Sequence, residues 1–346
     1  MTTAEKAYKA AGVDIEAGNR AVDLMRQAVE STYGPRVLRG IGAFGGMYDG
    51  CFEDMQSPVL VASTDSVGTK TMVAAALGRF DTIGQDLVNH CINDILVQGA
   101  RPLFFLDYFA SSHLVPEMVA RVVEGCAVAC READCALLGG ETAELPGVYQ
   151  PHEFDLVGAI VGVVDREHVV DGRLVGVGDA VVGLASTGLH TNGYSLARRV
   201  LARFDWQTLL PTLGQTIGEA LLAVHRSYLR HVATLWRGGV TVKAMAHITG
   251  GGLVDNVPRA LPSGLTVDLR PANWAVPPIF RLIQQEGGIS QEEMRHAFNM
   301  GIGLVIVVSP DEVGRTLELL NGGTLPGEAW HIGQVTAGRG VRFLDR

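Results

Sequence analysis

Hydrophobic residues follow two different periods along this chain. Short runs of consecutive apolar residues, typical of buried strands, alternate with longer stretches in which apolar residues recur every three or four positions, as in amphipathic helices. Within Thr82–Gln98, for example, Ile83, Leu87, Cys91 and Ile95 form one apolar stripe at i+4 spacing. The alternation predicts an α/β (α+β) protein in which mixed sheets pack against helices.

The first half of the chain is predicted to form one such unit of sheet and helices. A glycine-rich loop, Arg39–Gly50, follows its first helix, and the polar stretch Asp165–Asp179 follows its last strand. We therefore expect two domains, residues 1–170 and 171–346. The expected strands of the first domain are Val59–Ser63, Leu103–Phe109, Cys135–Leu138 and Asp155–Val164, and its expected helices are Asn19–Ser31, Thr82–Gln98 and Val115–Ala133.

The second half shows the same alternation of strand and helix patterns. The order of the strands in either sheet is not fixed by the sequence. The expected strands are Ala180–Ala185, Lys243–His247, Leu265–Leu269, Ile302–Val308 and Trp330–Val335, and the expected helices are Tyr194–Phe204, Thr216–Trp236, Leu253–Ala260, Phe280–Glu286 and Asp311–Asn321.

Composition and charge narrow the class of protein. With 47% hydrophobic and 19% charged residues, the 346-residue chain is expected to be globular. Its net charge of −9, without a basic run, argues against nucleic acid as a partner. Because no apolar run approaches the roughly 20 residues that span a bilayer and no signal peptide is recognisable, we expect no membrane partner. Five cysteines without a CxxC pair fit reduced thiols, so the expected location is cytoplasmic.

The segment Ser63–Thr71 is the strongest candidate for chemistry. An apolar run leads directly into Asp65, Gly68, Thr69 and Lys70, and Lys70 is one of only four lysines in the chain. A carboxylate, a backbone that allows close approach and a compact cation together suit a magnesium–phosphate complex. The P-loop string GxxxxGK[ST] does not occur, so nucleotide binding at this segment would be of a different kind.

Two further acidic residues stand at the ends of predicted elements. Asp94 lies on the polar edge of the helix Thr82–Gln98, where a solvated surface and a structural role for His90 are the alternatives. Glu141 follows an apolar strand and is flanked by Gly139, Gly140 and Thr142. Since three carboxylates that meet without a cation would repel one another, we predict Mg²⁺ at Asp65, Asp94 and Glu141.

Three polar loops mark the second half. The loop Ala185–Ser195 lies between a strand and a helix and suits an anion site or, at His190, proton transfer. The segment Ala246–Gly252 resembles a phosphate nest, in which His247 is either catalytic or structural. The turn Phe298–Gly303 fits a tight turn before a core strand as well as a binding role. The candidate residues of the first two loops are Ser186, Thr187, His190, Asn192, His247, Thr249, Gly250, Gly251 and Gly252.

One motif match is rejected. Residues 40–45 satisfy GxGxxG, and Asp65 follows about twenty residues later, as in a dinucleotide-binding fold. A helix rather than a strand precedes these glycines, and the residues after them are poor helix formers. We therefore interpret Arg39–Gly50 as a glycine-rich lid.

Taken together, these segments resemble aminoimidazole ribonucleotide synthetases, also called phosphoribosylformylglycinamidine cyclo-ligases. The resemblance covers almost the full chain in one order: YKAAGVDIEAGN (Tyr8–Asn19), TDSVGTK, NDILVQGARPLFFLDY, GGETAELPG, STGLHTNGYSL, HITGGG and FNMGIG. The TDSVGTK and NDILVQGARP types are shared with selenophosphate synthetase and thiamine-phosphate kinase. The strings YKAAGVDI, STGLHTNGYS and HITGGG are more specific.

The resemblance implies an ATP- and Mg²⁺-dependent ring closure in purine biosynthesis, which converts formylglycinamidine ribonucleotide into aminoimidazole ribonucleotide, ADP and phosphate. It also implies a homodimer whose N-terminal domains pair into a sheet barrel. By this resemblance, Asp65, Asp94 and Glu141 hold the metal, and Gly68, Thr69, Lys70, Gly139, Gly140 and Thr142 join them around ATP. The ribonucleotide would lie at Ser186, Thr187, Asn192 and Thr249–Gly252, with Lys70, His190 and His247 as the catalytic candidates.

Two departures and two alternatives accompany this interpretation. Ser66 stands where the family usually has glycine, and the helix around Arg26 lacks most of the family's lysines. A relative with the same ATP site and another acceptor would release ADP only with that acceptor. A catalytically silent nucleotide-binding subunit would bind ATP without turnover, although Lys70 and the three acidic residues argue against it.

Overall fold

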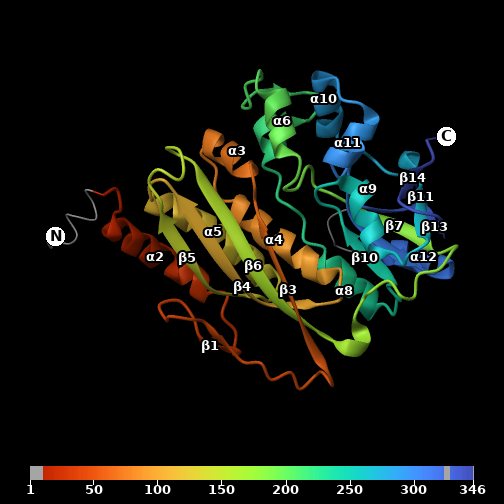
Figure 1. Ribbon diagram of the computed structural model, residues 1–346, viewed down its shortest axis with the longest axis horizontal. Helices are drawn as coiled ribbons and strands as arrows, with labels where there is room; N and C mark the ends of the chain where they lie inside the picture. Colours follow the sequence, from red (N-terminus) through yellow and green to blue (C-terminus); the bar gives the residue numbers. More distant parts are fainter. Residues whose placement is uncertain (1–10, 323–327, 346) are drawn as a thin grey trace. The chain divides into compact units, whose positions relative to one another are not determined.

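The computed structural model describes residues 11–322 and 328–345. The start of the YKAAGVDI string, Tyr8–Ala10, and the lysines Lys6 and Lys9 lie outside them. The chain divides into two compact units: the first contains the described residues up to Ile95 together with Ala100–Arg166, and the second contains Leu96–Gly99 and the described residues from Glu167 onward. Each unit has its own sheet (Figure 1). None of the helices within the described ranges is long and apolar enough to cross a membrane.

The first unit is built on a four-stranded mixed sheet. Its strands lie in the order β3 (Pro58–Ser66), β6 (Phe154–Asp165), β4 (Arg101–Ser111) and β5 (Ala136–Glu144). The pairs β3–β6 and β6–β4 are antiparallel, whereas β4–β5 is parallel. A parallel pair needs a crossover connection, and helix α5 (Pro116–Glu132) supplies it.

Helices cover one face of this sheet and leave the other open. Helix α4 (Ile83–Leu96) packs closely on β6, because a Cβ at Gly162 would lie only 2.5 Å from Ile95. Helix α2 (Ile15–Glu30) packs against α5 (Figure 1). On the opposite face, Leu60 and Leu106 are 64% and 38% exposed. The open face therefore presents apolar side chains to solvent.

The second unit contains a six-stranded sheet with a hydrophobic cluster on each face. On one face, Val182 and Ile306 pack with helix α8 (Leu229–Arg237). On the other, Val181 and Val305 pack with Leu253 and its neighbours. The strand order is β10 (Ala244–His247), β12 (Ile302–Val308), β7 (Ala180–Ala185), β13 (Ala329–Ala337), β11 (Leu265–Leu269) and β14 (Val341–Phe343), in which only the last pair is parallel.

The remaining elements are short. In the first unit they are β1 (Val37–Arg39), β2 (Met47–Tyr48) and α3 (Lys70–Leu77). In the second they are α6 (Tyr194–Leu201), β8 (Leu209–Leu210), β9 (Gln215–Thr216), α7 (Ile217–Leu221), α9 (Gly252–Asn256), α10 (Pro278–Gly287), α11 (Gln291–Ala297) and α12 (Val313–Asn321), with 3₁₀ turns at Arg166–His168, Val257–Ala260, Pro271–Asn273 and Pro310–Glu312.

The prediction of one helix over Thr216–Trp236 is wrong. Helix α7 ends at Leu221 and α8 begins at Leu229, with an irregular segment between them. Arg226 Nη1 and Tyr228 Oη both donate hydrogen bonds to the carbonyl oxygen of Ala185, at 2.8 and 2.9 Å. These bonds hold the segment against the end of β7, so tertiary contacts override the helical pattern.

The prediction that the third strand ends at its glycines is also wrong. Strand β5 continues to Glu144, because its backbone pairs with β4 as far as Ser111. Gly140 is required within the strand, since a Cβ there would lie 2.3 Å from Oδ1 of Asp107 on β4. Gly139, Gly140, Glu141 and Thr142 are therefore strand residues rather than a loop.

Candidate active site

In the first unit, a polar cluster lies where β3 meets α4. His90 Nε2 is 2.8 Å from Oδ2 of Asp65 and 3.8 Å from Oδ2 of Asp94. Ser63 Oγ donates a hydrogen bond to Asp94 at 3.1 Å. The i,i+4 spacing places His90 and Asp94 on one face of the helix, and the two-residue spacing places Ser63 and Asp65 on one face of the strand. The structure thus brings two of the three predicted metal ligands to the same histidine.

The cluster favours a proton on His90. Burial alone would lower the pKa of His90, but its hydrogen bond to Asp65 and the nearby carboxylates raise that pKa overall. Burial would raise the pKa of Asp65, yet His90 lowers it overall. A protonated His90 would compensate the negative charge of two carboxylates, one on each element.

Lys70 is placed differently from the expectation. Its side chain is completely buried at the start of α3 and forms an ion pair with the equally buried Asp86 of α4, at 2.8 Å between Nζ and Oδ2. Burial lowers the pKa of Lys70, and Asp86 opposes that shift. The sequence marked Lys70 as unusual but did not indicate Asp86 as its partner. Gly68, with a φ of 62°, and Thr69 precede the buried amine.

Glu141 lies apart from Asp65 and Asp94 within one chain. The register places Ser66, Val157, Tyr108 and Glu141 in one row across the four strands, so their side chains share a face. Asp65 is the neighbour of Ser66 and faces the other side. Three strand spacings of about 4.8 Å also separate the backbones of Ser66 and Glu141. The three-carboxylate site is not formed by the described residues of a single chain.

Asp107 is a half-buried carboxyl group that the sequence analysis did not select. It lies on β4 in the same row as Asp65, on the face covered by the helices. Burial raises the pKa of Asp107 to about 7, although part of its surface reaches solvent. It therefore exchanges a proton near neutral pH.

In the second unit, the predicted loops adjoin one another. Ser186 Oγ and Asn299 Oδ1 are 3.0 Å apart, and Asn299 Nδ2 donates to the carbonyl oxygen of Gly188 at 2.8 Å. The turn Phe298–Gly303 thus holds the loop that follows β7. The buried Asn192 Nδ2 has no hydrogen-bond partner among the described residues. Asn192 also reaches the glycine loop, because a Cβ at Gly250 would lie 3.4 Å from its Oδ1.

Asn256, which the sequence analysis missed, closes the glycine loop. Its Nδ2 donates to the carbonyl oxygens of Gly250 and Gly252 at 3.0 and 2.9 Å, and Thr249 Oγ1 lies 3.3 Å from its Oδ1. Gly252 has a φ of 59°, and a Cβ there would lie 2.0 Å from the carbonyl oxygen of Arg295. Steric contact and backbone conformation both require glycine at this position.

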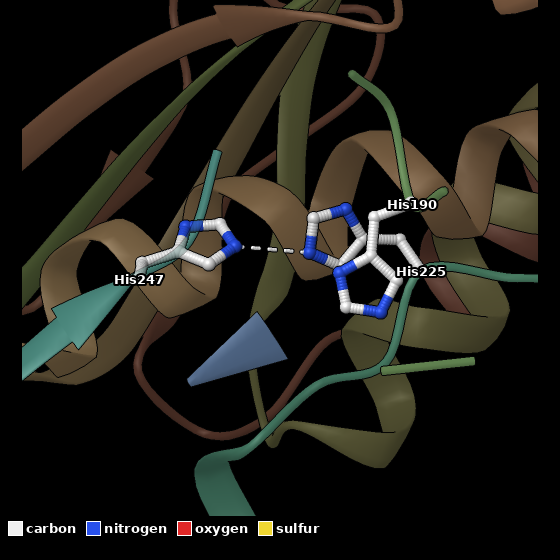
Figure 2. Close-up of side chains that lie close together, drawn as sticks. All are labelled: His190, His225 and His247. Atoms are coloured by element: carbon white, nitrogen blue, oxygen red, sulfur yellow. Dashed lines mark hydrogen bonds between the residues drawn. The ribbon is translucent and has the colours of Figure 1, made fainter. Parts of the chain in front are cut away.

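Three buried histidines lie between these loops. Figure 2 shows His190, His225 and His247, which come from the loop after β7, the segment between α7 and α8, and the end of β10. Their ring nitrogens include a set within 4.8 Å of one another. His225 was missed because it was expected within a helix.

His190 has its Nε2 occupied within its own loop. The backbone N–H of Thr187 donates to His190 Nε2 at 3.2 Å, so this nitrogen accepts and the proton of a neutral ring lies on Nδ1. The residue has a φ of 61°, which is uncommon for histidine. In this arrangement Nε2 is occupied by the N–H of Thr187 and is not available to abstract a proton.

Comparisons with known proteins agree with the division of the chain into two units. A family described as AIR synthase related protein matches residues 49–164 with its N-terminal domain and residues 176–346 with its C-terminal domain. The phosphoribosylformylglycinamidine cyclo-ligase of Geobacillus thermodenitrificans (strain NG80-2) is 49% identical over 341 residues, 98% of each chain. That of Desulfitobacterium hafniense (strain DSM 10664 / DCB-2) is 50% identical over 306 residues, 88% of this chain and 90% of the relative.

Solved structures show the same fold at lower identity. E. coli HypE aligns with a TM-score of 0.67 at 20% identity, covering 93% of this chain and 92% of its own. Thiamine-monophosphate kinase from Stenotrophomonas maltophilia K279a aligns with a TM-score of 0.66 at 17% identity, covering 94% and 96%. The two-domain match and the near-complete alignment with curated relatives place this chain in the AIR synthase family, among the phosphoribosylformylglycinamidine cyclo-ligases.

Proposed function

We propose that the chain closes the imidazole ring of formylglycinamidine ribonucleotide with ATP, giving aminoimidazole ribonucleotide, ADP and phosphate in the cytoplasm. The observation that carries the proposal is the 49% identity, over 98% of both chains, to a relative named for this cyclo-ligation. ATP would phosphorylate the formyl oxygen and leave as ADP. The amidine nitrogen would then attack the formyl carbon and displace phosphate. Such a reaction requires that the triphosphate is held in place, that the amidine nitrogen is aligned with the formyl carbon, and that water is excluded.

The polar cluster of the first unit suits the magnesium–triphosphate end of ATP. Asp65 and Asp94 offer the hard oxygen ligands that Mg²⁺ prefers. Both carboxylates lie near His90 Nε2, so a divalent ion would supply the positive charge that a protonated His90 otherwise would. When bound, the ion would neutralise charge on the transferring phosphoryl group. Gly68 and Thr69, at the start of α3, would present backbone to the phosphates.

We propose that Lys70 positions this segment. Its pair with Asp86 ties the beginning of α3 to α4, and so fixes Gly68 and Thr69 relative to Asp94. Direct contact of Lys70 with phosphate would require the buried pair to open.

A homodimer would supply the third carboxylate of the proposed metal site, which a single chain does not bring to Asp65 and Asp94. Glu141 points to the open face of the sheet, with Gly139 and Thr142 beside it on β5. The exposed side chains of Leu60 and Leu106 on that face fit burial against a second copy. Because Asp65 faces the helix-covered side, we propose that Glu141 of one copy reaches Asp65 and Asp94 of the other past the edge strand β3. Gly140 would serve by leaving room for Asp107.

The loops of the second unit are proposed to hold the ribonucleotide. The segment Thr249–Gly252 would bind its phosphate through backbone amides. The buried Asn192 Nδ2, together with Ser186 and Thr187, would orient the reacting groups. His247 is the better candidate for proton transfer, because it ends β10 immediately before the Thr249–Gly252 loop.

The test is a product assay. Purified protein with formylglycinamidine ribonucleotide, ATP and Mg²⁺ should form one aminoimidazole ribonucleotide per ADP. ADP release that requires another acceptor would indicate a related kinase or synthetase instead. Tight ATP binding without turnover, and without rescue of a purine-requiring strain, would indicate a silent nucleotide-binding subunit.

A further inference from the structure

The segment that carries His225 is held in place on both sides of this residue. Before it, Thr187 Oγ1 donates to the carbonyl oxygen of Val224. After it, Arg226 and Tyr228 bind the carbonyl oxygen of Ala185. His225 itself is completely buried. The imidazole therefore occupies a fixed position next to the proposed substrate loops.

Each ring nitrogen of His225 faces a different polar group. Nε2 lies 3.0 Å from Nε2 of His247 (Figure 2). Nδ1 lies 3.3 Å from Oγ1 of Thr191. The ring also stacks on His190, with centroids 4.0 Å apart and planes 20° apart. The stack, the hydroxyl and the second imidazole together restrict rotation of the His225 ring.

The contact between two Nε2 atoms couples the tautomers of the two rings. At 3.0 Å one nitrogen must donate and the other accept, because two lone pairs or two N–H groups would repel. If His225 donates, a neutral His247 carries its proton on Nδ1. If His225 accepts, His247 carries it on Nε2. The Thr191 hydroxyl can act as donor or acceptor, so it satisfies Nδ1 of His225 in both cases.

A shared metal ion is the competing explanation for three adjacent imidazoles. An imidazole binds a metal in its ring plane, and Zn–N bonds of about 2.0–2.1 Å place tetrahedral nitrogens roughly 3.3 Å apart. The stacked, nearly parallel planes of His190 and His225 do not converge on one point. The 3.0 Å approach of His225 to His247 fits a hydrogen bond better than two ligands of one ion.

We propose that His225 is a positioning residue that couples the tautomer of His247 to its own and fixes the orientation of that ring, and so prepares His247 for proton transfer to or from the ribonucleotide. The functional half of this proposal rests on the proposed cyclo-ligation. The contact between the two rings does not. His247 ends β10 immediately before the Thr249–Gly252 loop, so a fixed ring would meet a substrate bound at that loop in a single orientation.

Two substitutions of His225 separate positioning from simple packing. In His225→Gln, the side-chain amide reaches about as far as Nε2 and retains a partner for His247. In His225→Asn, the shorter amide retains only the contact near Thr191. We expect kcat to stay within about threefold for His225→Gln and to fall at least about tenfold for His225→Asn, with KM for ATP changed by less than about twofold. His331→Gln, an exposed site on β13, is the matched control.

Long-range ¹H–¹⁵N spectra of the histidine rings provide a readout that does not depend on catalysis. The ¹⁵N shifts of His247 should be alike in the unsubstituted protein and in His225→Gln, and should change in His225→Asn, where His247 Nε2 loses its partner. Unchanged His247 shifts in His225→Asn would overturn the proposal, as would altered shifts with an unchanged kcat. Stoichiometric Zn²⁺ binding that shifts all three rings together would also overturn it. An unsubstituted protein without cyclo-ligase activity would refute the proposed function instead, while its spectra would still test the contact.

Discussion

Replacing Lys70 with methionine tests whether this lysine stabilises the fold or grips a nucleotide. Lys70 and Asp86 are both fully buried, and their charged atoms lie 2.8 Å apart. Lys70→Met would leave the Asp86 carboxylate without its cation, which typically costs about 3–5 kcal/mol of folding free energy. Replacing both residues, as Lys70→Met with Asp86→Leu, removes the stranded charge and should recover at least about 2 kcal/mol of that loss.

Urea unfolding followed by circular dichroism measures the free energy of unfolding of Lys70→Met, of Asp86→Leu and of the double variant, which together form a thermodynamic cycle. Arg20→Met is a matched control in the same unit, since its pair with Glu117 is exposed and should cost less than about 1 kcal/mol. A loss below about 1 kcal/mol for Lys70→Met, or a double variant no more stable than either single one, would refute the buried-pair argument.

ATP binding by the double variant then separates the two roles. A lysine that only positions α3 should leave the Kd for ATP within about fivefold, because the start of the helix stays packed. If Lys70 contacts phosphate once the pair opens, the double variant should bind ATP more than about tenfold more weakly, which corresponds to about 1.4 kcal/mol. The folded double variant makes this comparison possible where the single variant does not.

Three further outcomes are expected. Asp94→Asn should lower kcat at least about 100-fold at saturating magnesium, and near-normal turnover would refute its proposed metal role. Leu106→Glu, on the open face, should produce monomers in analytical ultracentrifugation, whereas an unchanged mass would argue against that face as the dimer interface. The pKa of Asp107 is raised to about 7, so the unfolded chain loses this proton first and stability falls as pH rises from about 4 to 7. Asp107→Asn should flatten that fall by about 2–3 kcal/mol in urea titrations at pH 5 and 8, and parallel curves would contradict it.

The strands at the centre of the second unit were predictable because they are buried on both faces. Strands β7 and β12, neighbours in the sheet, have the predicted bounds, and β12 is buried at every position. Burial on both faces demands a continuous apolar run, which the sequence displays directly. By contrast, the break between α7 and α8 depends on hydrogen bonds to Ala185, about forty residues earlier in the chain. A local pattern contains no information about such a partner.

The same distinction applies to the candidate site. Asp65 and Asp94 could be selected because their residue type and their place at the end of an element are both local properties. Asn299 could not, because its role comes from Ser186, 113 positions away in the sequence. Lys70 was selected for its rarity, but rarity fits a buried ion pair as well as a phosphate contact. Only the position of Asp86 distinguishes the two.

Glu141 shows how one error in a strand boundary changes a proposed mechanism. If β5 ended at its glycines, Glu141 would lie in a loop and could turn toward Asp65. Because the strand continues, its register with β4 fixes Glu141 to the open face. A metal site that combines Glu141 with Asp65, on the opposite side of the sheet, therefore requires Glu141 from a second chain that reaches past the edge strand β3. The face offers exposed Leu60 and Leu106, so the requirement for a partner carboxylate and the need to bury apolar surface both point to the same dimer.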